Sequence, residues 1–287
     1  MPIPLNPWPA STAHGQQSLV KVDHSFIRVH RYRAPGPGAA RNNPDRSGDG
    51  RVTFVLVHGI GLNSAYLGPL AEELSTAGEV MVIDLPGFGD LPRPKATYSI
   101  KAFATAMKRA MELYGVRDPI LVGHSMGAQI VVELMASYGY RRATLVGPPV
   151  NARERSGPIA VFRYLQSALY EKPNLALMAV KSYFEAITSW VLEVLPAMMD
   201  YPIEQRITEL DADAQVAFVR GQHDYLAPPD WIDQLRGAVA RSSNYTIAGA
   251  AHSTVFNDDD AVARAARSLL TKAERARLSG DHGVPSC

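Results

Sequence analysis

Apolar and polar positions alternate near the start of the chain. In SLVKVDHSFIRVHRYRA, residues 18–34, apolar side chains occupy every second position over short stretches, as they do in half-buried strands. We expect one or two antiparallel edge strands there. Residues 35–50 are rich in Pro, Gly, Asn and Asp, which sustain neither a helical nor a strand period, and they predict an exposed loop.

After this loop, short apolar runs alternate with longer amphipathic segments. The runs are rich in β-branched residues, as strands buried on both faces are, and they read VTFVLVHG, EVMVIDLPG, PILVGHS, RATLVGP and AQVAFVRG. Between the second and third runs, we expect a helix with one apolar face formed by Phe103, Met107, Met111 and Leu113. Repeated strand–helix units predict an α/β fold, a mostly parallel twisted sheet of about eight strands with helices on both faces.

The alternation stops between residues 151 and 213, where no run has the character of a strand. Apolar residues recur there with helical spacing, first at Phe162, Leu165 and Leu169, and later at Val180, Phe184, Ile187, Val191 and Val194. We therefore expect a helical cap inserted into the sheet domain. Its thioether and aromatic side chains are candidates to line a substrate pocket: Met178, Tyr183, Phe184, Trp190 and Met198. An equally good interpretation is that they only hold the cap against the main domain.

These patterns predict the organisation of the whole chain. A loose N-terminal segment, residues 1–16, precedes an α/β core formed by residues 17–150 and 214–272. The helical cap, residues 151–213, interrupts that core, and a polar tail, residues 273–287, follows it.

The composition of the chain is typical of a globular protein and excludes several function classes. Hydrophobic residues make up 46% of the 287 residues and charged residues 20%. Lys and Arg number 29 against 28 Asp and Glu, without a long basic run, so nucleic acid is not an expected partner. The only cysteine is Cys287, which rules out an internal disulfide and a cysteine-based metal site. We expect neither a metal nor a cofactor.

The sequence also carries expectations about location and partners. The first residues, MPIPLNPWPA, contain four prolines and no apolar stretch behind a basic start, so they do not resemble a secretory signal. No run approaches the roughly 20 apolar residues that span a bilayer. We therefore expect a cytoplasmic protein that acts on a small molecule, and the sequence leaves the formation of a homo-oligomer open.

The segment LVGHSMGAQIVVEL, residues 121–134, changes from a strand pattern to a helix pattern at a serine. Gly123 and Gly127 stand two residues before and two residues after Ser125. A strand that turns at once into a helix brings these backbones close together, leaves no space for a Cβ atom and pushes the serine hydroxyl outward. The following helix directs its free N–H groups toward that hydroxyl. The pattern predicts a nucleophilic serine at the edge of the sheet where ligands bind.

A serine hydroxyl needs a general base and a carboxylate that orients the base. Of the eight histidines, His252 follows the strand-like run NYTIA, whereas the other distant one, His282, lies in the polar tail. His252 is therefore the expected base. Asp224 follows the run AQVAFVRG and should lie at the same edge of the sheet as Ser125, so it is the expected acid. Its alternative role is that of a turn residue that caps the next helix.

Acyl transfer also needs N–H donors for the tetrahedral oxygen. The glycine-rich strand end in VLVHGIGLNS presents the backbone N–H of Ile60, and the start of the next helix after Ser125 presents that of Met126. We expect these two groups to form an oxyanion hole. His58 is expected to hold the loop by hydrogen bonds rather than to take part in the chemistry.

The order of five motifs resembles the α/β-hydrolase superfamily, in particular the capped branch that includes carboxylesterases, thioesterases, lipases and C–C bond hydrolases. The motifs are HGIG, DLPGFGD, GHSMG, GQHDYLAP and GAAHS, and the resemblance covers residues 50–270. It implies that Ser125 is the nucleophile, Asp224 the acid and His252 the base. It also implies a cap over the active site. Relatives that open epoxides or displace halide carry aspartate in place of the serine, which argues against both activities.

We therefore expect a serine hydrolase that cleaves a carboxylic ester of a small-to-medium, partly apolar substrate through an acyl-enzyme on Ser125. A thioesterase would use the same residues. So would a C–C bond hydrolase of ring-cleavage dienones, in which Arg153 and Arg155 could bind a second carboxylate. From another class, the same fold could serve as a non-hydrolytic receptor for a small molecule.

Overall fold

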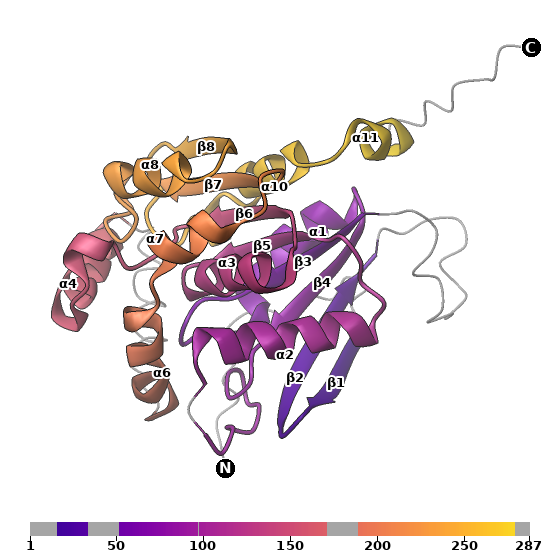
Figure 1. The fold of residues 1–287 in the computed structure, drawn as a ribbon, viewed down its shortest axis with the longest axis horizontal. Helices are drawn as coiled ribbons and strands as arrows, with labels where there is room; N and C mark the ends of the chain where they lie inside the picture. The colour runs from indigo at the N-terminus through magenta and orange to yellow at the C-terminus, as the bar shows by residue number, and fades with distance from the viewer. Residues whose placement is uncertain (1–15, 34–51, 97, 171–188, 279–287) are drawn as a thin grey trace, which may run out of the picture.

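An eight-stranded sheet forms the centre of the molecule (Figure 1). The computed structural model describes residues 16–33, 52–96, 98–170 and 189–278. The spatial order of the strands is β1-β2-β4-β3-β5-β6-β7-β8. Their bounds are β1 Gln16–Val22, β2 Ser25–Tyr32, β3 Thr53–Val57, β4 Glu79–Asp84, β5 Ile120–His124, β6 Arg142–Val146, β7 Gln215–Gly221 and β8 Arg241–Ile247.

The first two strands pair antiparallel with each other, and β2 pairs antiparallel with β4. Every further pair is parallel. The antiparallel pair at the edge and the mostly parallel centre are thus confirmed. The loop predicted at residues 35–50 lies outside the described residues.

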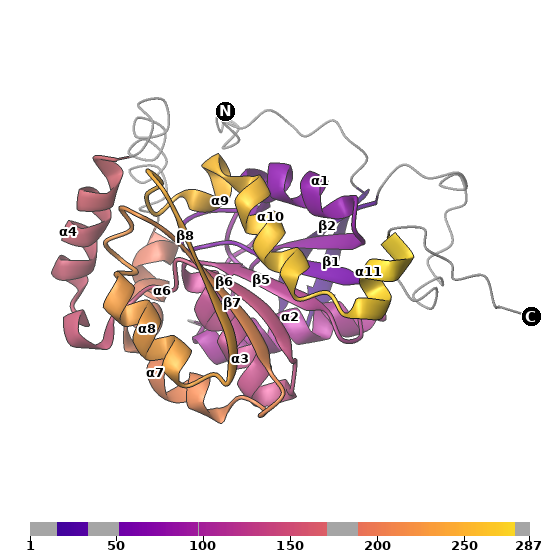
Figure 2. The ribbon, with the colours of Figure 1, turned by 90° about the horizontal axis from the view of Figure 1, so that it is seen from above.

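Helices cover both faces of the sheet (Figure 2). Successive side chains of a strand point to opposite faces, so Leu121 of β5 packs in one core cluster while Ile120 and Val122 pack in the other. The first cluster lies under α2 (Ile100–Leu113), α3 (Met126–Tyr138) and α8 (Pro229–Gly237). The second lies under α1 (Gly68–Ser75) and α10 (Asp259–Ser268). The predicted α/β fold class is confirmed.

One detail of α2 differs from the prediction. Phe103, Met107 and Met111 are fully buried as expected, but Leu113 is 67% exposed. Residue 113 follows residue 111 by two positions, which rotates its side chain by about 200° around a helix with 3.6 residues per turn. Assigning Leu113 to the buried face was therefore wrong.

The connection between β6 and β7 contains the segment predicted to be a cap. Its described part is helical: η2 (Ala152–Glu154), α4 (Gly157–Ala168), α6 (Ser189–Asp200), α7 (Ile203–Arg206) and η3 (Ile207–Glu209). In α4 and just after it, Phe162, Leu165 and Leu169 are exposed. The helical spacing of these three residues therefore predicted a helix correctly, although their face does not pack against the described residues. Val180, Phe184 and Ile187 lie outside the described residues.

The β6–β7 connection is tied to α3 by a buried ion pair. Glu133 of α3 accepts hydrogen bonds from Arg206 Nε and from the Tyr201 hydroxyl, both at 2.9 Å. Burial favours the neutral form of Glu133, but bonds from Ser137, Arg206 and Tyr201 outweigh it, so the pKa of this carboxyl lies below its usual value. These bonds attach the β6–β7 connection to α3 at a point more than two helical turns beyond Ser125.

The C-terminal part of the chain is anchored in a similar way. Residues at the start of the predicted polar tail form α11 (Lys272–Leu278), an exposed polar helix. Glu274 of this helix accepts hydrogen bonds from buried Arg142 at 2.7 and 3.0 Å. Within the described residues, no helix has both the length and the apolar character needed to cross a membrane.

Candidate active site

Ser125 occupies a sharp turn between β5 and α3. Its φ angle is 54°, in the left-handed region that residues other than glycine rarely adopt. A Cβ atom on Gly123 would collide with the backbone of Gly127, and one on Gly127 would collide with the carbonyl of Val57. The two glycines are therefore required by close packing of the backbone, as the sequence predicts.

The Ser125 hydroxyl is not used to build the turn. Ser125 is the N-cap residue of α3, yet its side chain makes no capping hydrogen bond, while its backbone N–H donates to Val146 O at 2.9 Å. Its exposed fraction is 8%. The first N–H groups of α3, beginning with Met126, have no acceptor within the helix and lie at its positive end. Oγ is therefore available for chemistry next to these donors.

Asp224 and His252 form a buried acid–base pair. His252 Nδ1 lies 3.0 Å from both carboxylate oxygens of Asp224, and the two residues are 5% and 1% exposed. Asp224 Oδ1 also accepts from the backbone N–H groups of Leu226 and Ala227. Burial opposes ionisation of Asp224, but His252 and these bonds outweigh it, so the pKa of Asp224 lies below its usual value. An ionised Asp224 holds the Nδ1 proton of His252 and leaves Nε2 as the basic nitrogen.

The fold brings this pair to the same place as Ser125. His124, the residue before Ser125, has its ring centroid 5.1 Å from that of His252. Gly147 follows β6, and a Cβ atom there would lie 2.8 Å from Asp224 Oδ2 and 3.0 Å from His252 Cε1. Gly59, after β3, would place a Cβ atom 3.1 Å from Ser125 Cβ. The ends of parallel strands thus assemble one site from segments far apart in the sequence.

Gly147 gives a direct test of this packing. Its φ angle is 52°, and alanine there would press against the acid–base pair. We expect Gly147→Ala to lower kcat/KM for ester substrates by about 10- to 100-fold, because small displacements of reacting groups are costly. Gly139→Ala is the matched control, since Gly139 has a φ angle of 71° but its added Cβ would meet nothing closer than 3.7 Å. If kcat/KM fell equally in both variants, the effect would come from backbone strain alone, which costs about 1–2 kcal/mol for a residue other than glycine in this conformation.

The loop after β3 carries the predicted oxyanion donor Ile60. His58 Nδ1 donates to Gly59 O at 2.8 Å, and His58 Nε2 accepts from Leu85 N at 3.0 Å. Burial lowers the pKa of His58 despite the nearby charge of Asp84, so the ring is neutral and serves to hold the loop. Gly59 lies so close to the turn that an added Cβ atom would be 3.1 Å from Ser125 Cβ. Ile60 is the next residue after Gly59, and Met126 directly follows the serine.

Arg220 is a site residue that the sequence reasoning missed. It is buried at the end of β7 and donates to the carbonyl groups of Ala227, Gln222 and Asp224 at 2.8, 3.1 and 3.3 Å. These bonds hold the loop that carries Asp224. A charged residue within the otherwise apolar run AQVAFVRG was the signal that could have indicated it.

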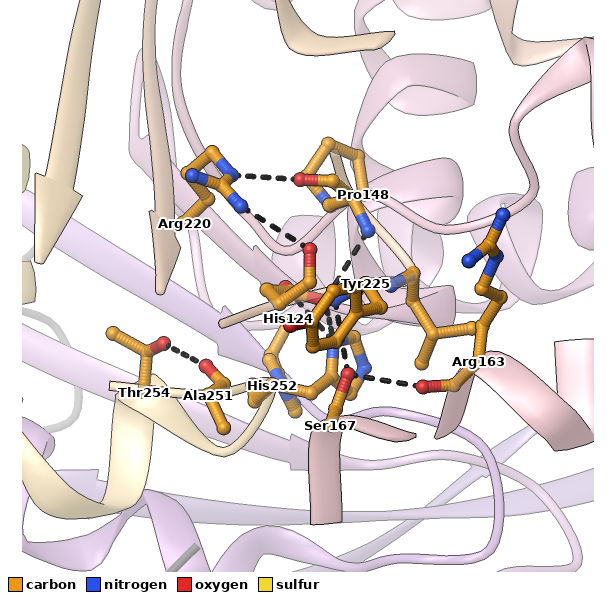
Figure 3. A network of polar contacts seen from close by, with 12 residues as sticks. His124, Pro148, Arg163, Ser167, Arg220, Tyr225, Ala251, His252 and Thr254 are labelled. Carbon is orange, nitrogen blue, oxygen red and sulfur yellow. Dashed lines mark hydrogen bonds and ion pairs between the residues drawn. The ribbon is translucent and has the colours of Figure 1, made fainter. Parts of the chain in front are cut away.

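Helix α4 also contacts this loop, and Figure 3 shows the contact around Ser167. Ser167 Oγ accepts from Tyr225 N at 3.0 Å. Tyr164 places its ring edge-on to that of His252, with centroids 6.4 Å apart, and Tyr170 stacks on His223 at 4.1 Å. The β6–β7 connection therefore packs directly against the acid–base pair.

The residues predicted to line a pocket separate into two groups. Trp190 is buried against Phe88 and Gly87, and the carbonyl of Met198 accepts from Gln129 Nε2 at 3.0 Å. These contacts attach α6 to the core and favour the packing interpretation for Trp190 and Met198. The other three, Met178, Tyr183 and Phe184, lie outside the described residues.

The two arginines considered for a second carboxylate are already paired. Arg155 donates to Glu204 at 2.7 and 2.9 Å, and Arg153 lies 3.5 Å from Asp230. The Arg155 pair is half-buried, whereas the Arg153 pair is exposed and therefore weak. In the part of the chain that the structure describes, no group of three or more His, Cys, Asp or Glu residues could hold a metal ion.

Comparison with known proteins places this site in a wider context. Residues 54–265 match the model of the alpha/beta hydrolase family. A curated relative, the biotin biosynthesis bifunctional protein BioHC of Cellvibrio japonicus, is 25% identical over 81% of this chain and 51% of its own length. The chain covers 51%, 28% and 57% of the length of three curated relatives that it matches, less than two thirds of each.

Solved structures share the fold at low sequence identity. Est816, described as an N-acyl homoserine lactone degrading enzyme, superposes with a TM-score of 0.69 at 17% identity, covering 88% of this chain and 100% of that one. A thermophilic esterase from Thermogutta terrifontis superposes with a TM-score of 0.68 at 18% identity, covering 88% and 97%.

Proposed function

The chain belongs to the alpha/beta hydrolase family, and from this membership we propose that it hydrolyses carboxylic esters through an acyl-enzyme on Ser125. The observation that carries the proposal is the buried Asp224–His252 pair beside a serine held in a strained turn. Such a serine is activated only when a base and an orienting carboxylate stand next to it. Asp224 and His252 are the groups that meet this need.

In the proposed reaction, His252 Nε2 takes the proton of Ser125 Oγ while Oγ attacks the ester carbonyl carbon. The backbone N–H groups of Ile60 and Met126 stabilise the resulting oxyanion. The C–O bond to the alcohol then breaks, and the leaving oxygen takes the proton from His252. Water, deprotonated by His252, attacks the acyl-enzyme by the same route and releases the acid. Asp224 keeps its charge throughout and holds the imidazole orientation.

Two observations support a small-to-medium, partly apolar substrate. The nucleophile is almost fully buried, and Tyr164 of α4 places its ring edge-on to that of the base. A buried nucleophile with an aromatic ring near its base favours a compact acyl or alcohol group over a polymer. The similar structures support the reaction type, since one is named an esterase and another an N-acyl homoserine lactone degrading enzyme, and a lactone is a cyclic ester.

The proposal is tested with a panel of aryl esters of increasing acyl length and with a fluorophosphonate probe. We expect turnover of the shorter esters and covalent labelling that maps to Ser125 by peptide mass spectrometry. Aryl thioesters form a parallel arm, and preferential turnover of these would shift the assignment to a thioesterase. Absence of both turnover and labelling, with small-molecule binding detected by thermal stabilisation, would support a non-hydrolytic receptor instead.

A further inference from the structure

Three buried hydrogen bonds connect the loop after β3, the nucleophile turn and the segment that carries His252. Gly59 N lies 3.0 Å from Tyr66 Oη, and Tyr66 Oη lies 2.8 Å from His124 Nδ1. His124 Nε2 lies 3.1 Å from the carbonyl oxygen of His252. Figure 3 shows the last of these three bonds, between His124 and His252.

The direction of each bond follows from the groups at the two ends. A backbone N–H can only donate, so Tyr66 Oη accepts from Gly59, and the hydroxyl proton then goes to His124 Nδ1. His124 must therefore carry its proton on Nε2, which donates to the His252 carbonyl, a group that can only accept. Burial, followed by the nearby His252, lowers the pKa of His124 to about 3, so the ring stays neutral. Burial also raises the pKa of Tyr66, which keeps the phenol protonated.

The connected residues adjoin the reacting groups of the proposed hydrolysis. Gly59 precedes Ile60, and His124 precedes Ser125. Tyr66 comes from η1 (Ser64–Leu67), and its ring lies edge-on to His124, with centroids 5.6 Å apart. A single tyrosine–histidine pair thus touches all three segments on which the reaction would depend.

The sheet alone does not fix the distance between these segments. β5 carries the nucleophile turn, and β6 and β7 separate it from β8, which precedes His252. The base lies on a loop beyond the paired residues of β8, which end at Ile247. Beyond Ile247 this loop is hydrogen-bonded to the turn after β7, where His223 N donates to Ala250 O and Gly249 N to Gln222 Oε1, both at 2.8 Å, and these bonds do not reach the turn of Ser125. The bond from His124 spans this gap directly.

We propose that Tyr66 and His124 are positioning residues for ester hydrolysis, which together hold the oxyanion loop, the nucleophile turn and the base in register. Neither residue transfers a proton in the reaction. This inference rests on the proposed function. It predicts that removing one of these hydrogen bonds lowers the rate of the chemical step and leaves substrate binding nearly unchanged.

The test begins with Tyr66→Phe, which removes one oxygen and leaves the ring. We expect kcat for the best aryl ester to fall about 10- to 100-fold, with KM changed less than about twofold and fluorophosphonate labelling slowed by the same factor as kcat. Tyr201→Phe is the matched control, because it removes another buried hydroxyl, one that bonds to Glu133 away from the site. It should lower the melting temperature and leave kcat unchanged.

Two further variants separate positioning from general damage. In His124→Gln the amide oxygen can accept from Tyr66 and the amide nitrogen can donate to the His252 carbonyl, so activity should exceed that of His124→Ala. Adding Tyr66→Phe to His124→Ala should lower kcat little further, because the single variant has already interrupted the series of hydrogen bonds. If the wild-type protein neither hydrolyses esters nor reacts with the fluorophosphonate probe, the proposed function and this inference are both refuted. An active wild type with an equally active Tyr66→Phe variant would overturn only the inference.

Discussion

Loss of nearly all ester hydrolysis is the expected result of Ser125→Ala. We expect kcat to fall by at least about 10⁴-fold, because the reaction loses its nucleophile and only the oxyanion donors and binding contacts remain. The serine side chain makes no capping hydrogen bond to α3, so its removal should change the free energy of unfolding little. Labelling by the fluorophosphonate probe should disappear completely.

The control for this variant is Ser75→Ala, at a half-buried serine at the end of α1 whose hydroxyl bonds only to Glu72 O among the hydrogen bonds described. It should retain full activity and labelling. Activity of the Ser125→Ala variant within about tenfold of the wild type would place the nucleophile elsewhere and refute the proposed mechanism.

Replacing the acid should have the second largest effect. We expect Asp224→Asn to lower kcat about 10³- to 10⁴-fold, because an amide N–H facing Nδ1 of His252 places the imidazole proton on Nε2, where no proton can then be accepted. The exposed Asp230→Asn variant, which affects only an ion pair with Arg153 in the described structure, should keep wild-type activity. A loss below tenfold in Asp224→Asn would show that another group orients the base.

The pH dependence of the Asp224→Asn variant follows from the lowered pKa of the wild-type carboxyl. Because this pKa lies below the usual value of 3.8, the group is charged at every pH above about 4, and kcat of the variant should stay below that of the wild type throughout about pH 6 to 8. The same shift stabilises the folded wild type above the unfolded-state pKa, and this contribution is lost as the pH falls through the folded-state pKa. Melting curves should therefore differ between the two proteins more at pH 7 than at pH 3.

The nucleophile turn could be predicted from the sequence because its constraints are local. Gly123 and Gly127 are needed where a strand and a helix share one tight turn, and residues close in sequence set that geometry. The apolar runs similarly predicted strands buried on both faces, since a parallel sheet covered by helices tolerates few polar side chains there.

The position of Asp224 illustrates a partial prediction. The sequence offered an acid of the site or a turn residue as alternatives, and the structure shows both sets of contacts at once. One carboxylate oxygen accepts from the turn amides of Leu226 and Ala227, and both oxygens lie near His252 Nδ1. The turn thus supplies part of the hydrogen bonding that keeps a buried carboxylate charged.

The β6–β7 connection shows where periodicity stops being informative. The spacing of Phe162 and Leu165 predicted a helix, yet these residues are exposed, whereas Ser167 and Tyr164 contact the core. An apolar stripe reveals a helical period, but the face that packs depends on the surface it meets. The residue type of Trp190 fitted either a pocket or the core, and its contact with Phe88 shows that it packs against the core.

The sequence by itself determined the class of fold, and it predicted which residues would gather at one edge of the sheet. Strand order along the chain and glycine spacing are enough for this, because parallel strands end at one edge. Only the tertiary structure decided how these residues are held. Tyr66, His124 and the carbonyl of His252 are joined by hydrogen bonds between positions as many as 128 residues apart. Such bonds arise from packing in three dimensions and leave no period or motif in the sequence.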